Sequence, residues 1–100
     1  MHRLLVLWND PDDREGFRRH YEETHAPLAR KMPGIRSYTI GFDVQTPDGP
    51  SPYFCVAQLD FDDEDAMNAA LGSPEGQAAA ADGAFAPKGA VVTHFEVHEV

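Results

Sequence analysis

The chain has 100 residues, the length of one domain with a modest core, so we expect a single domain over residues 1–100. Its formal net charge of −9 argues against a nucleic-acid partner, because phosphate binding needs clustered Lys and Arg. No apolar run approaches the roughly 20 residues of a membrane-spanning helix, and the lone cysteine, Cys55, cannot form an internal disulfide. We therefore expect a cytoplasmic protein with no membrane partner.

The first element is predicted to be a strand over His2–Trp8, with largely apolar residues on both faces. A turn then leads into a helix, for which Asp10 is the expected N-cap and Pro11 the first residue. Residues at helical spacing predict the buried stripe of this helix: Phe17, Tyr21, Thr24 and Leu28.

Pro27 lies inside this helical pattern. Proline lacks an N–H and clashes with the carbonyl four residues earlier, so it should free the carbonyl of Glu23. We expect a break or kink around residues 24–26, followed by a second short helical piece from about 27 to 31. His25 lies on the expected break, where an imidazole has better access to a cavity than in a continuous helix.

The rest of the chain alternates strands and helices. The expected strands cover Ile35–Val44, Tyr53–Phe61 and Ala90–Val100, and the Pro- and Gly-containing segment Thr46–Pro52 is expected to be a loop. The expected helix caps are Asp62 or Asp63 for one helix, which Gly72 ends, and Ser73 for the next.

This order, strand-helix-strand twice, predicts an α+β fold of ferredoxin-like βαββαβ type, with a four-stranded, mostly antiparallel sheet and helices on one face. The first and third strands are expected to be apolar on both sides, so the uncovered side of the sheet would expose an apolar patch. A second copy related by a two-fold axis is the simplest cover, and we therefore predict a homodimer.

His25 is the residue most suited to chemistry, because imidazole changes charge near neutral pH and can act as a general acid or base. Tyr21, one turn earlier, could orient the ring or stabilise an oxyanion. Aromatic and small side chains predict a cavity between the open sheet face and the kinked helix, lined by Trp8, Tyr21, His25, Tyr38, Phe42, Tyr53, Cys55 and Phe95. The competing interpretation is that these side chains form the core.

Other chemistries find less support in the sequence. His94, Glu96 and His98 share a face of the last strand, but solvated polar residues explain them more simply than a metal does. Cys55 is expected to be a small buried hydrophobe rather than a nucleophile. There is no Gly-rich phosphate loop, nucleophile elbow or dinucleotide fingerprint, so we expect neither a metal nor another cofactor.

The segment from Tyr21 to Gly34 resembles the EthD family, in which a helix with a YxxxHxPL motif runs into a PG turn and a strand. The matching residues are Tyr21, His25, Pro27, Leu28 and Pro33-Gly34, followed later by Phe61-Asp62-Asp63 and the segment SPEGQA over residues 73–78.

The resemblance implies a dimeric α+β barrel, whose relatives by fold include lactone isomerases, polyketide cyclases and cofactor-free oxygenases. It implies a small protein of catabolism that binds or acts on a hydrophobic or aromatic compound in a dimer cavity, with His25 as general acid or base. Two alternatives stay open: a non-catalytic accessory or ligand-binding protein, and a structural dimer module without a ligand.

Overall fold

The structure is a computed structural model that describes all residues from 1 to 100. Its main sheet has four strands in the order β2-β5-β1-β6, and every neighbouring pair is antiparallel. The strands are β1 (His2–Asn9), β2 (Ser37–Phe42), β5 (Tyr53–Phe61) and β6 (Ala90–Glu96). The predicted α+β fold with a ferredoxin-like antiparallel sheet is confirmed.

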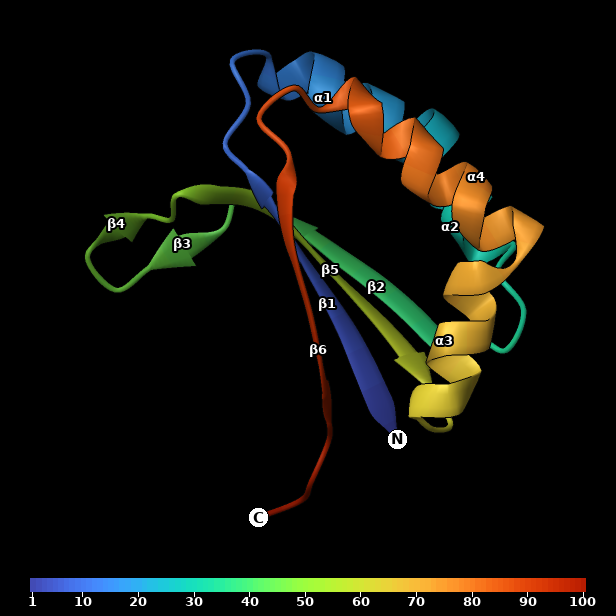
Figure 1. Ribbon diagram of the computed structural model, residues 1–100. Coiled ribbons are helices and arrows are strands. Elements are labelled where there is room, and N and C mark those ends of the chain that lie inside the picture. The colour runs from blue at the N-terminus through green and yellow to red at the C-terminus, as the bar shows by residue number, and fades with distance from the viewer.

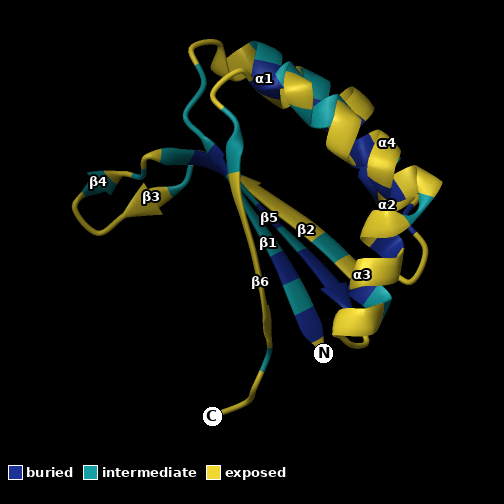
Figure 2. Ribbon diagram, in the orientation of Figure 1, coloured by how far each residue is buried: buried dark blue, intermediate teal, exposed yellow.

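The helices gather on one face of this sheet, as Figure 1 shows. They are α1 (Arg14–His20), the π-helical turn η1 (Tyr21–His25), α2 (Ala26–Arg30), α3 (Glu64–Gly72), α4 (Pro74–Asp82) and the 3₁₀ turn η2 (Gly83–Phe85). Burial is concentrated on the central strands β1 and β5, whereas the edge strand β6 is mostly exposed (Figure 2). None of the helices combines the length and apolar character needed to cross a membrane.

The helix caps follow the sequence in two cases out of three. Asp63 accepts a hydrogen bond from the N–H of Ala66, and Ser73 accepts one from Gly76, as expected for N-caps. The first helix is capped by Asp13 instead of Asp10, so that prediction is wrong. Asp10 is used elsewhere: its carboxylate accepts two hydrogen bonds from Arg14.

Pro27 does not break the helix. The chain stays helical from Arg14 to Arg30, and a π-helical turn immediately precedes the proline, with the Ala26 N–H donating to the carbonyl of Tyr21. A π turn holds more residues than an α turn, so it moves the buried stripe by one position. His25 and Ala29 are buried, in place of the expected Thr24 and Leu28.

The segment expected to be a loop after the second strand forms a small separate ribbon, β3 (Gln45–Thr46) and β4 (Gly49–Pro50), which projects beyond the sheet in Figure 1. Two expected strands are also shorter than predicted. The chain enters β2 only at Ser37, and β6 ends at Glu96 rather than at Val100.

The face of the sheet away from the helices carries an apolar group that we call the open-face patch: Leu5, Leu7, Val56, Val91 and Phe95. Val91 and Phe95 are 44% and 43% exposed. The third predicted strand is β5, and the prediction that it is apolar on both sides is wrong. It places Asp60 on the face away from the helices. Asp60 accepts two hydrogen bonds from Arg3, at 2.8 and 3.2 Å.

Candidate functional site

A cavity of about 280 Å³ lies between the helix-covered face of the sheet and the helices. Its volume is slightly below the range of about 300–1,000 Å³ that is usual for small-molecule sites, and its wall is mainly apolar, as such sites require. The lining residues come from all four main strands and from η1, α2, α3 and α4: Leu4, Val6, Trp8, Tyr21, His25, Ala29, Met32, Tyr38, Ala57, Leu59, Leu71, Gly76, Ala79, Ala80, Gly83, Ala90 and Val92.

The sequence predicted a cavity between the open sheet face and the kinked helix, whereas this cavity lies between the helices and the sheet face that they cover. The space lies within one chain because α4 presents small side chains, Ala79 and Ala80, above the sheet. Two lining residues, Val92 on β6 and Leu71 on α3, remain 61% and 38% exposed. They mark the opening of the cavity between the edge strand and the helices.

Gly76 allows α4 to pass close to the end of α3. A Cβ at this position would collide with the backbone carbonyls of Ala70 and Leu71. The capping hydrogen bond from Gly76 to Ser73 fixes the start of α4 at the same point. The Ser-Pro-Glu-Gly sequence over residues 73–76 thus fixes where α4 begins relative to the end of α3.

His25 lies at the end of the π turn, where it is only 8% exposed and lines the cavity. Its Nδ1 is 2.9 Å from Oδ2 of Asp82, and its ring meets the indole of Trp8 edge-on, with 5.3 Å between centroids. An ionised carboxylate only accepts hydrogen bonds, so Nδ1 carries the proton. Nε2 makes no hydrogen bond within the protein, and the second ring nitrogen is left for a molecule in the cavity.

Asp82 joins this histidine to a second one. His20 Nε2 lies 3.0 Å from both oxygens of Asp82, and its ring stacks on Phe85 at 4.2 Å. Burial alone would raise the pKa of Asp82, but the hydrogen bonds from His25 and His20 outweigh it and lower that pKa below its ordinary value. The carboxylate is therefore ionised at neutral pH and holds the His25 ring in one orientation.

Sequence reasoning missed Asp82, although one signal was present. It is the last residue of α4, and an acidic group at a helix C-terminus faces the negative end of the helix dipole. Such a position is unfavourable unless the carboxylate has partners elsewhere in the fold. The position of Asp82 thus indicates that it has a partner, but the sequence does not say which residue that partner is.

Tyr21 and Tyr38 face one another across the cavity wall with 2.6 Å between their hydroxyl oxygens. Burial raises the pKa of both phenols, and in Tyr21 the neighbouring Tyr38 raises it further. Both side chains are neutral at ordinary pH and act as hydrogen-bond groups. The indole N–H of Trp8 is buried without a well-formed hydrogen bond, and it lies close enough to Tyr21 to lower the pKa of that phenol in part.

Four of the sequence-predicted cavity residues lie outside the cavity. Phe42 packs edge-on against Tyr21 at 5.8 Å, in the core. Cys55 is fully buried, and burial raises the pKa of its thiol to about 12. Tyr53 lines a small surface hollow next to Asp10. Phe95 belongs to the open-face patch on the opposite side of the sheet, because its register position pairs with Arg3.

The structure thus brings together Trp8, Tyr21, His25 and Tyr38 at one cavity. A neutral imidazole with a free Nε2 can accept a proton, and an adjacent carboxylate stabilises the imidazolium that forms. A tyrosine hydroxyl can donate to an oxygen on which negative charge develops.

The EthD domain model matches residues 9–85 of the chain. The chain is 33% identical over 99 residues to an uncharacterized 11.0 kDa protein from the thcB–thcC intergenic region of Rhodococcus erythropolis, covering 99% of this chain and 96% of that protein.

Solved structures give the same result. A crystal structure of an EthD family protein from Bacillus halodurans superposes with a TM-score of 0.93 at 33% identity, covering 98% of this chain and 99% of the other. A protein of unknown function from Thermobifida fusca, described as a dimeric ferredoxin-like protein, matches with a TM-score of 0.70 at 25% identity over 96% and 90% of the two chains. The chain therefore belongs to the EthD family.

Proposed function

We propose that the chain binds a small hydrophobic or aromatic compound in the cavity beside His25, and that it is a cofactor-independent enzyme of a degradation pathway. The reactions that we propose are isomerisations or cyclisations, as catalysed by the isomerases and cyclases that are related by fold. One observation carries this proposal: a buried imidazole, fixed by a carboxylate through Nδ1, lines an apolar cavity with its Nε2 free. This is the arrangement that a general base needs.

In this proposal Nε2 of His25 removes a proton from a carbon or hydroxyl of the bound compound and later returns it to another atom. Asp82 stabilises the imidazolium in between without taking up the proton itself. A hydroxyl of the Tyr21–Tyr38 pair binds the oxygen that becomes negative. No redox step is required, because the proton leaves and returns within one molecule.

Binding can be tested before the substrate is known, with 1-naphthol as the probe because it combines an apolar ring with one hydroxyl. We expect a titration to shift the NMR signals of the Trp8 indole and the His25 ring. Ala80→Phe should abolish these shifts, because Ala80 lines the cavity. Ala78→Phe is the matched control on the same helix, since Ala78 is exposed and lies outside the cavity. Equal binding by the two variants would contradict the proposal.

A non-catalytic binding protein is the second candidate, and the composition of the cavity wall favours it. His25 is the one lining residue with a side chain that ordinarily titrates near neutral pH, so a second proton carrier is missing. Under this alternative, a natural ligand from the pathway binds and is released unchanged. Product formation from that ligand, dependent on His25, decides for the enzyme.

We further propose a homodimer that buries the open-face patch. This patch contains two half-exposed apolar residues, Val91 and Phe95, on a sheet face that no helix covers. Light scattering at micromolar concentration should give twice the chain mass, and Phe95→Asp should give a monomer. The control is Glu96→Ala on the same strand, because Glu96 points to the other face. A monomeric wild-type protein would contradict this proposal.

A further inference from the structure

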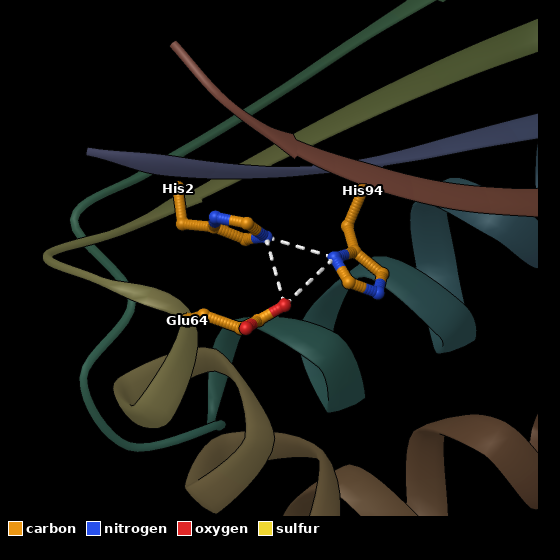
Figure 3. A group of neighbouring side chains, drawn as sticks. All are labelled: His2, Glu64 and His94. Carbon is orange, nitrogen blue, oxygen red and sulfur yellow. Dashed lines mark hydrogen bonds and ion pairs between the residues drawn. The ribbon is translucent and has the colours of Figure 1, made fainter.

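A second group of chemically active side chains lies away from His25, at the start of β1. His2, Glu64 and His94 come from three elements, β1, α3 and β6, and their side chains converge on one point in Figure 3. His2 and His94 lie on the helix-covered face of neighbouring strands, and Glu64 is the first residue of α3. The sequence did not indicate this group, because the three residues are far apart in the chain.

The distances within the group suit a metal ion. His2 Nε2 lies 2.8 Å from His94 Nδ1, and Oε1 of Glu64 lies 4.0 Å from the first nitrogen and 3.7 Å from the second. An ion held tetrahedrally by ligands at about 2.0–2.1 Å separates its ligand atoms by about 3.3 Å. The observed separations bracket this value, so side-chain adjustments of well under about 1 Å would complete the geometry.

The ligand types point to a particular class of ion. Two imidazoles and one carboxylate form the protein ligand set of catalytic zinc sites and of facial-triad sites for other divalent transition metals. Ca²⁺ and Mg²⁺ prefer oxygen ligands and fit less well. We propose that His2, Glu64 and His94 bind a divalent first-row transition metal ion, with Zn²⁺ as the first choice.

The surroundings support a metal site with one ligand fixed and coordination positions left open. His2 is 8% exposed, so its ring is held by the core, whereas the side chains of His94 and Glu64 are 45% and 56% exposed. Water or a bound molecule can therefore reach the ion from the solvent side. The site lies next to the cavity, because His2 and His94 are each two positions along the strand from a cavity-lining residue on the same face, Leu4 and Val92.

The competing occupant of this point is a proton shared between the two rings, whose nitrogens are within hydrogen-bond distance. A shared proton explains the contact between the histidines but gives Glu64 no close partner. Its carboxylate lies 3.7 Å or more from both rings, beyond an ordinary hydrogen bond. A central cation accounts for all three side chains.

Isothermal titration of the chelator-treated, full-length protein with Zn²⁺ tests the proposal. We expect saturable binding of one ion per chain. His94→Ala and Glu64→Gln should each weaken binding at least about tenfold, since even the loss of an outer-shell partner costs about 10–100-fold. Both residues are about half exposed, so the variants should fold, which circular dichroism checks.

His98→Ala and Glu96→Gln are the matched controls, because both residues are exposed near the end of β6 and neither belongs to the group. They should bind Zn²⁺ like the wild type. Three results would each overturn the proposal: no saturable binding by the wild type, unchanged affinity in His94→Ala or Glu64→Gln, or an equal loss in the controls. None of these results depends on whether the cavity is an enzyme site.

Discussion

Two clusters of the same composition lie at opposite ends of strand β1, and they are built in opposite ways. At the Trp8 end, His25 and His20 both bond to the central carboxylate of Asp82, at 2.9 and 3.0 Å. At the His2 end, two imidazoles contact one another and the carboxylate of Glu64 lies 3.7–4.0 Å from them. Two histidines and one acidic residue therefore occur twice, with the anion in the middle in one case and at the side in the other.

The difference shows why residue types alone do not define a site. When the carboxylate lies in the middle, it satisfies both rings and fixes their orientation, which leaves a ring nitrogen free for proton transfer. When all three groups point at one empty point, they resemble a ligand set. Burial adds to the contrast, since Asp82 is partly buried and Glu64 is exposed.

The largest expected effect concerns the two histidines that share Asp82. Once a converted compound is known, His25→Gln should lower turnover about 10²–10⁴-fold, the usual contribution of general acid–base catalysis. His20→Gln removes the other partner of Asp82, but His20 does not line the cavity, so turnover should change only a few-fold. Steady-state kinetics of both variants measures this. If both variants lose the same share of turnover, His25 only holds Asp82 in place and does not transfer the proton.

A smaller effect is expected on stability, where the carboxylates of Asp82 and Glu64 should differ. Asp82→Asn should lower the free energy of unfolding by about 1–3 kcal/mol, because it leaves two ring nitrogens with a poorer, uncharged partner. Glu64→Gln should change it by less than about 0.5 kcal/mol, as expected for an exposed side chain without a close contact. Urea denaturation of metal-free protein gives both values. A larger loss in Glu64→Gln would reverse the comparison.

The pH dependence of stability tests the contribution of the Asp82 carboxylate further. The folded-state pKa of Asp82 is lowered, so its stabilising contribution is present above the ordinary Asp pKa of about 3.9 and is lost as the pH falls through the lowered value. The stability gap between wild type and Asp82→Asn should therefore shrink when urea denaturation is repeated at about pH 3 instead of about pH 5. A gap that stays constant would mean that the carboxylate does not interact with the histidines in its charged form.

The smallest expected signal comes from the core beneath the His25 cluster. Cys55 pairs with Trp8 across β5 and β1, is fully buried, and has a pKa raised to about 12 by that burial. Its thiol should stay unreactive toward a disulfide reagent at about pH 8, where a free cysteine, with a pKa of about 8.5, reacts readily. The reaction should become complete in denaturant. Fast labelling of the native protein would mean that the core beneath the His25 cluster opens to solvent.

Much of the fold could be predicted because it rests on local signals. Alternation in the four strands, the caps Asp63 and Ser73, and the turn at Pro33-Gly34 indicated the βαββαβ order. The π turn could not be predicted from the proline alone, because a break and a widened turn both relieve the clash at Pro27. That choice decides which side chains are buried, and it explains why His25 faces inward while Thr24 does not.

The site was predicted less well for a related reason. Trp8, Tyr21, His25 and Tyr38 do meet, but Phe95 was assigned without knowing which face of β6 meets the helices. The face is set by the pairing register, where one step exchanges the two sides of a strand. The partners of both clusters, Asp82 and Glu64, lie more than 50 residues from the histidines of the first third of the chain. No spacing rule could connect them.

The account depends most on the way Asp82 holds His25, and long-range ¹H–¹⁵N NMR of the histidine rings measures this directly. We expect the neutral form of the His25 ring to carry its proton on Nδ1 and to leave Nε2 unprotonated, because a carboxylate partner at Nδ1 selects this tautomer. Asp82→Asn should abolish this preference. A His25 ring with its proton on Nε2, or one unaffected by Asp82→Asn, would contradict the account.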